Sequence, residues 1–250
     1  MFEPPQHSLF DRIPAPEATL WKYLSFAKLT LLLNKCSLHC TRVDTFEDRI
    51  EGRWPLKDLE FFKRPGNGDA LEELARARRS SVVSSWVDRA NESAAMWPLY
   101  GGNANEGVAI TTTFAKLERA VAETARRAQH QGWYAGSVRY LHFGQDEGVI
   151  SAADGEKPSL LKVFTLKHSS YEHECEVRAL GIDFEKPMPR DGAEIAIAPA
   201  DFIDAIVVNP LAGRWFCGLV GEAAAAHGLE GRVRRSEISD LEEEAEAQQA

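Results

Sequence analysis

Hydrophobic and polar residues recur along the chain with two different periods, which together predict a mixture of helices and strands. Apolar residues three and four positions apart predict helices over 26–34, 116–129, 160–168 and 213–227. Apolar, β-branched and alternating stretches predict strands over 21–23, 37–43, 82–87, 107–114, 134–143, 171–180, 202–208 and 233–238. Because the two kinds are interspersed without a strict strand–helix–strand rhythm, we expect an α+β fold: one compact domain with mixed or antiparallel sheets and flanking helices.

The predicted strand over 171–180 carries an unusual pattern of charge. Alternation along a strand places Glu172, Glu174 and Glu176 on one face, and Arg178 continues that face. Carboxylates this close repel one another and cannot enter a core without partners. The face is therefore either a solvated edge or lies against positive groups, and Lys167 just upstream supplies a cation.

Two further segments combine aromatic and polar side chains. Trp21 and Tyr23 flank Lys22 on a predicted strand, so the rings could stack on a flat ligand while Lys22 meets a phosphate or carboxylate. The alternative places both rings in the core and Lys22 in solvent. Trp97 and Tyr100 share one helix face, either as core aromatics or with Tyr100 reaching a cleft from the helix end.

The irregular segment over 46–54 holds three acids and two aromatic residues. Its carboxylates could position a base or bind a metal, although no histidine lies at the usual ligand spacing, and they could instead pair with Arg49 and Arg53. The common sequence signatures of dinucleotide-binding loops, phosphate-binding loops, nucleophile elbows and zinc proteases are absent. The sequence therefore predicts no metal site and no established catalytic motif.

Composition and charge limit the domain organisation, the cellular location and the partners that we expect. The chain has 250 residues, of which 44% are hydrophobic, and a formal net charge of −9. We expect an N-terminal extension over 1–19, one domain over 20–239 and an acidic tail over 240–250. Scattered cysteines, with neither a secretory signal nor a long apolar run, predict a cytoplasmic protein with no membrane partner. The acidic balance weighs against nucleic acid as a partner without excluding a local basic groove.

Several short motifs occur in an order that resembles a known family. Leu20-Trp21-Lys22-Tyr23, Phe46-x-Asp48, Met96-Trp97-x-x-Tyr100 followed by 107–110, and Tyr171-Glu172-x-Glu174-x-Glu176-x-Arg178 resemble the largely prokaryotic domain-of-unknown-function family 2971. The resemblance spans about 20–238. The chain departs from the family where Glu47 and Arg49 replace a common asparagine and proline, and at Pro98-Leu99. The family name supplies no reaction.

The layout is also similar, more loosely, to the ADP-ribosyltransferases. That likeness implies NAD as substrate, with Glu176 as the catalytic carboxylate and Glu174 as its partner toward the acceptor. Lys22 and Arg178 would hold phosphates or orient the glutamates. Tyr23 and Tyr100 would flank the base, with Trp97 beside them.

Two other functions stay open from the residues. A non-catalytic module of a phage-defence or toxin–antitoxin system would bind a partner protein and use Lys22, Glu174 and Arg178 as a structural ion network. A metal-dependent nuclease would hold Mg²⁺ on Asp48, Glu174 and Glu176. The partner expected overall is a nucleotide or a protein.

Overall fold

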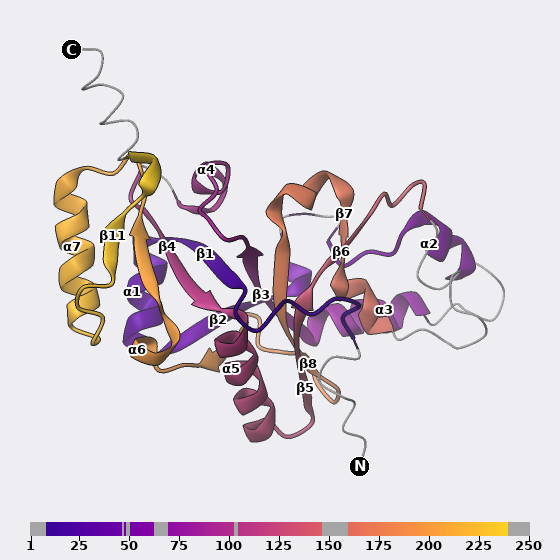
Figure 1. The fold of residues 1–250 in the computed structure, drawn as a ribbon. Coiled ribbons are helices and arrows are strands. Elements are labelled where there is room, and N and C mark those ends of the chain that lie inside the picture. Colours follow the sequence, from indigo (N-terminus) through magenta and orange to yellow (C-terminus); the bar gives the residue numbers. More distant parts are fainter. Residues whose placement is uncertain are drawn as a thin grey trace. The chain divides into compact units, whose positions relative to one another are not determined.

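The computed structural model describes residues 9–46, 48, 51–62, 70–102, 105–146 and 160–239. The chain divides into two compact units (Figure 1). The first comprises 1–14, 39–85 and 118–195, and the second comprises 15–38, 86–117 and 196–250. The predicted acidic tail and the loop residues Glu47 and Arg49 lie outside the described residues. The expectation of a single domain over 20–239 stays a prediction.

Most elements belong to one unit. Those of the first unit are η1 (Val43–Thr45), α2 (Leu56–Phe62), α3 (Ala70–Arg79), β5 (Gln131–Ser137), β6 (Arg139–Leu141), η2 (Leu160–Thr165), β7 (Leu166–His168), η3 (Ser169–Glu174) and β8 (Glu176–Asp183). Those of the second are β1 (Thr19–Ser25), α1 (Phe26–Lys35), α4 (Met96–Tyr100), β4 (Gly107–Thr113), α6 (Pro199–Phe202), β10 (Ala205–Val208), α7 (Arg214–Ala225) and β11 (Val233–Arg235). Four cross the division: β2 (Ser37–Arg42), β3 (Ser81–Asp88), α5 (Phe114–Arg127) and β9 (Ala193–Ala196).

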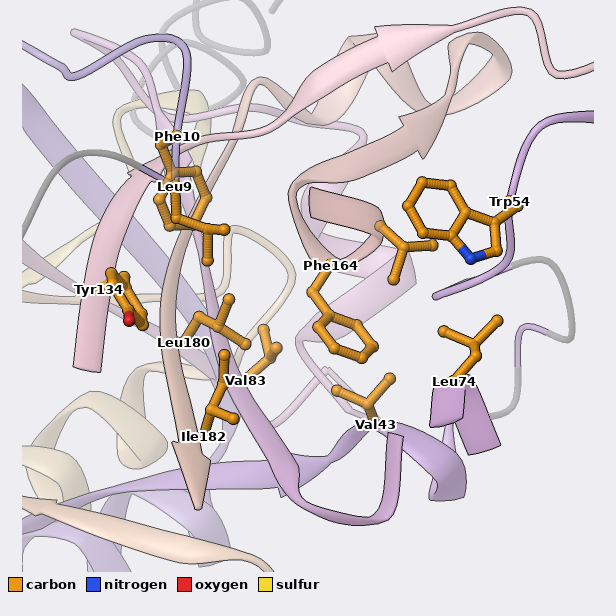
Figure 2. Close-up of a cluster of buried hydrophobic side chains, with 11 residues drawn as sticks. Leu9, Phe10, Val43, Trp54, Leu74, Val83, Tyr134, Phe164, Leu180 and Ile182 are labelled. Atoms are coloured by element: carbon orange, nitrogen blue, oxygen red, sulfur yellow. The ribbon is translucent and has the colours of Figure 1, made fainter. Parts of the chain in front are cut away.

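The first unit is organised around the antiparallel pair β5 and β8, in which Gly136 lies opposite Arg178. A buried cluster fills this unit, and Figure 2 shows Phe164 pointing toward Val43 within it. Leu9 and Phe10 are buried in the same cluster, although the sequence placed them in an N-terminal extension. Burying apolar side chains of this size contributes about 1.5–3 kcal/mol each.

The second unit has antiparallel pairing of β1 with β4 and of β4 with β10, while β10 and β11 run parallel. Ser25 caps the start of helix α1, because its hydroxyl accepts a hydrogen bond from the Lys28 amide. The helix buries Leu29, Leu32 and Leu33, as the apolar spacing predicts. Mixed strand pairing together with interspersed helices confirms the predicted α+β class.

Several predicted elements differ from those observed. The strand expected over 134–143 is two strands, β5 and β6, which pair with different partners, and the strand expected over 233–238 ends at Arg235. The strand expected over 171–180 is a 3₁₀ turn up to Glu174, followed by β8 from Glu176. The strand expected over 202–208 begins only at Ala205, because Pro199 starts a short helix in the preceding residues. The helix expected over 160–168 is a 3₁₀ segment followed by β7. Among the helices in the described ranges, none has the length and hydrophobicity that a membrane span requires.

Candidate functional site

The charged residues of the late strand meet other charges inside the first unit. We call Glu51, Lys167, Glu174, Glu176 and Arg178 the carboxylate–cation network. Strand β7 supplies Lys167, the end of η3 supplies Glu174, and the start of β8 supplies Glu176 and Arg178. Glu51 comes from the turn before α2. Glu174 and Glu176 therefore turn inward toward cations, as one of the two interpretations of the sequence required. Glu172, which was expected on the same face, is instead exposed in η3.

Lys167 joins the two glutamates of this network. Its Nζ donates to Oε2 of Glu174 at 2.5 Å and to Oε2 of Glu176 at 2.8 Å. Charge-assisted hydrogen bonds of this kind are shorter and stronger than those between neutral groups. Both carboxylates are thereby held against one ammonium group.

Arg178 connects Glu176 to the rest of the first unit. Its Nε donates to Oε1 of Glu176 at 2.7 Å, and its Nη2 donates to Oε2 at 3.1 Å. Nη1 donates to the Phe164 carbonyl at 2.8 Å, and Nη2 also bonds the carboxylate of Glu51. This fork of donors fixes the plane of the Glu176 carboxylate.

The network is buried, and its charges set one another's protonation. The side chains of Glu176 and Arg178 are each only 2% exposed. Burial raises the pKa of the Glu176 carboxyl, but Arg178 and Lys167 together lower it to about 2. Burial lowers the pKa of Lys167, and Glu176 and Glu51 outweigh that effect and raise it above its ordinary value. The carboxylate and the ammonium group are therefore both ionised near neutral pH.

Local backbone geometry brings the two glutamates to the same lysine. Cys175 ends η3 in the left-handed region, with φ of 46°, and its amide donates to the Glu172 carbonyl. The amide of Glu176 then donates to the Tyr140 hydroxyl at 2.7 Å. Strands β6 and β7 run parallel with Tyr140 opposite Lys167, so this hydroxyl lies next to the network. Burial raises the pKa of Tyr140, which keeps its hydroxyl neutral.

Glu51 reaches Arg178 because the next residue is a glycine with φ of +65°. A Cβ at Gly52 would lie 3.1 Å from Cγ1 of Val43, tighter than ordinary packing. The left-handed conformation costs a residue with a side chain about 1–2 kcal/mol. This turn is therefore specified by glycine for both conformational and steric reasons.

Substituting Gly52→Ala should lower the free energy of unfolding by about 1–2 kcal/mol in a urea titration. Gly144→Ala is a matched control in the same unit, because a Cβ there would meet its nearest neighbour at 3.8 Å and its φ is not positive. The control should show no loss of stability. Equal stability of the two variants would show that the Gly52 turn does not hold Glu51.

The proposed ligand-binding residues Lys22, Tyr23, Trp97 and Tyr100 belong to the second unit. Tyr23 and Trp97 are buried and pack edge to face, with ring centroids 4.9 Å apart. The Tyr23 hydroxyl accepts from the Ser93 amide at 2.9 Å, and burial raises its pKa to about 12. Their roles toward a ligand stay predictions.

The other two residues of this group are more accessible. Tyr100, the last residue of α4, is 47% exposed. The Lys22 Nζ lies 5.2 Å from the centroid of the Trp86 ring in the same unit. Among the residues expected at the site, the structure thus brings together Glu174, Glu176 and Arg178 in the first unit.

Sequence reasoning missed part of the network. Tyr140 was not identified, and Glu51 was considered only as part of an acidic loop. Lys167 was noted as a nearby cation, whereas the structural ion network was expected to use Lys22. The position of Lys167 directly after the mostly apolar run 163–166 could have indicated its burial. A lysine that is carried into the interior needs a partner of opposite charge.

A magnesium site on Asp48, Glu174 and Glu176 is not supported. Among the residues that the structure describes, no group of three histidine, cysteine, aspartate or glutamate side chains is arranged to hold a metal ion. Two of the three proposed ligands are instead engaged by Lys167. The nuclease hypothesis therefore lacks its metal centre in the described part of the chain.

No protein-family model matches the chain, and no curated protein matches it. The resemblance to family 2971 is thus not confirmed. Among solved structures, the chain is similar to DarT from Thermus sp. 2.9 in complex with carba-NAD⁺, with 10% identity, a TM-score of 0.39 and coverage of 91% of this chain and 98% of DarT. The complex of the same DarT with ADP-ribosylated ssDNA gives 12% identity, a TM-score of 0.39 and coverage of 92% and 98%. Values this low do not assign a function.

Proposed function

We propose that this protein is an enzyme that transfers the ADP-ribosyl group of NAD, with Glu176 as the catalytic carboxylate and Glu174 as its partner toward the acceptor. One observation carries the proposal: two carboxylates converge on Lys167 inside the first unit, and the pKa of Glu176 is held near 2. An ionised carboxylate at a buried position stabilises positive charge more strongly than it would in water.

The chemistry needs such a group. When the bond between ribose C1′ and the nicotinamide nitrogen breaks, its electron pair leaves with neutral nicotinamide and positive charge develops on the ribose. Glu176 would stabilise that charge, while the acceptor forms its bond to C1′ and gives its proton to Glu174. Arg178 and Lys167 would keep the Glu176 carboxylate in one orientation, so that little reorganisation is needed during the reaction.

In the same proposal, the residues predicted to contact the nucleotide keep their roles. Lys22 and Arg178 would contact phosphates or orient the glutamates, and Tyr23, Trp97 and Tyr100 would flank the base. The half-exposed phenol of Tyr100 supports a contact of this kind, because its ring is partly open to solvent.

A second candidate is a non-catalytic role, in which the network only joins segments of the first unit. The burial of Glu176 and Arg178 favours it, since every hydrogen bond described above from these two side chains goes to another group of the protein. Removing one partner of a buried ion pair destabilises a protein by about 3–5 kcal/mol. The two candidates differ in what happens to a variant that still folds.

The test is release of nicotinamide from labelled NAD by the full chain. Glu174→Gln and Glu176→Gln should each lower the rate about 100-fold while the circular dichroism spectrum is retained, because each removes a charge needed in the transition state. Glu123→Gln is the control, since that carboxylate lies in exposed ion pairs of α5.

Absence of both nicotinamide release and a thermal shift with NAD would overturn the enzymatic proposal. Retained activity in a folded Glu176→Gln variant would remove Glu176 from the catalytic role. Unfolding of both glutamine variants, together with an inactive parent protein, would favour the structural network.

A further inference from the structure

The second unit contains a cavity of about 570 Å³ that is separate from the carboxylate–cation network. Helix α7 and strand β11, which lie side by side in Figure 1, line it. Its volume lies in the range of small-molecule sites. Two arginines, Arg214 and Arg235, face this cavity together with the half-buried Cys217.

The topology places both arginines at one end of the cavity. Strands β10 and β11 are parallel neighbours, and α7 connects them. In such a unit, the start of the helix and the end of the second strand lie at the same edge of the sheet. Arg214 is the first residue of α7 and Arg235 is the last residue of β11. Two guanidinium groups at one edge are suited to bind phosphate oxygens.

The rest of the cavity is apolar and open. Leu229, which is buried, and Val233, the first residue of β11, also line the cavity. Gly218 also lines it, and a Cβ added to this glycine would meet no atom within 4 Å. Gly218 is exposed, so this part of the cavity is open to solvent and a bound molecule could lie over α7 there.

From this arrangement we infer that the cavity binds a small phosphorylated molecule of the nucleoside phosphate class. Arg214 and Arg235 contact its phosphates, and the nucleoside lies over Gly218 against Leu229 and Val233. Two cations at one end and apolar residues at the other select a ligand with a charged head and an uncharged body. This site does not depend on the ADP-ribosyl transfer proposed above.

The rate at which Cys217 is alkylated reports whether the cavity is occupied, because Cys217 lines it. The full chain is treated with iodoacetamide, with and without ADP, and modification of each cysteine is followed by peptide mass spectrometry. With ADP at ten times its dissociation constant, Cys217 should react about tenfold more slowly, because only the unbound fraction reacts. Cys36 is exposed at the C-terminal end of α1 and is the internal control. Its rate of alkylation should not change when ADP is added. Pyrophosphate should protect more weakly than ADP, and adenosine least.

Variants of Gly218 separate binding from folding. Gly218→Met places a long side chain in the cavity, while Gly218→Ala adds only a methyl group, and both improve helix propensity over glycine. We expect the methionine variant to lose the protection of Cys217 by ADP with an unchanged or raised melting temperature, and the alanine variant to keep it. Arg235→Gln should weaken protection at least tenfold.

Three results would overturn the inference: no protection of Cys217 by ADP or pyrophosphate at about 1 mM, equal protection of Cys36, or full protection in Gly218→Met. Nicotinamide release does not enter this measurement, so its outcome is independent of whether the first unit uses NAD.

Discussion

Replacing Arg178 with methionine is expected to lower the free energy of unfolding by about 3–5 kcal/mol. The guanidinium group bonds Glu176 through two nitrogens and also bonds Glu51 and the Phe164 carbonyl. Methionine fills much of the same volume, but it cannot donate hydrogen bonds to Glu176, Glu51 and the Phe164 carbonyl. The cost arises because the desolvated Glu176 carboxylate has lost one of its two cations, and Glu51 has lost its bond to Arg178. Urea titration followed by tryptophan fluorescence measures it.

Arg126→Met is the matched control for this prediction. Arg126 pairs with Glu123 on α5, and their side chains are 69% and 50% exposed. Surface ion pairs contribute about 0–1 kcal/mol, so this variant should change stability very little. A loss below about 1 kcal/mol in Arg178→Met would show that the network contributes no more than surface charges do.

The second large effect is a loss of stability in acid that depends on Glu176. The folded pKa of about 2 lies below the ordinary glutamate value of 4.5. Between these values the unfolded state binds more protons, so stability rises with pH. The contribution is fully present above pH 4.5 and is lost as pH falls through about 2. Its full size is about 3 kcal/mol, of which about 2 kcal/mol should be gone at pH 3.

Unfolding free energies at about pH 5.5 and pH 3 test this, with the parent protein compared to Glu176→Gln. The glutamine cannot titrate, so the variant should lose about 2 kcal/mol less than the parent over this interval. Other carboxyl groups titrate in both proteins and cancel in the comparison. An identical pH dependence in parent and variant would contradict the depressed pKa of Glu176.

Much of the fold followed from local patterns. The apolar spacing of α1 was sufficient to predict that helix and its buried face. The structure adds the Ser25 cap before it and the left-handed Cys36 after it. The prediction of one strand over 171–180 was partly wrong, because alternation alone cannot distinguish an extended segment from a 3₁₀ turn that ends at Cys175. Short turns depend on which neighbours they pack against, and a sequence window does not contain those neighbours.

The candidate site shows the same division. Clustered glutamates indicated either a solvated face or nearby cations, and the second alternative holds for Glu174 and Glu176. Lys167 was noted as a nearby cation, but Glu51 could not be chosen from many surface charges, since it is 127 residues from Arg178 along the chain. The cavity beside α7 was not predicted at all, because its residues come from two elements whose pairing is decided by the sheet.

By itself, the sequence determined the α+β class and the apolar face of α1, and it limited the late glutamates to a solvated face or a place beside positive charge. Each of these follows from interactions within a few residues, or from the cost of burying like charges together. Only the tertiary structure decided that Lys167 supplies that charge, that Glu51 completes the network, and that Arg214 and Arg235 share one cavity. Contacts between distant segments depend on strand order and register, which local periodicity does not encode.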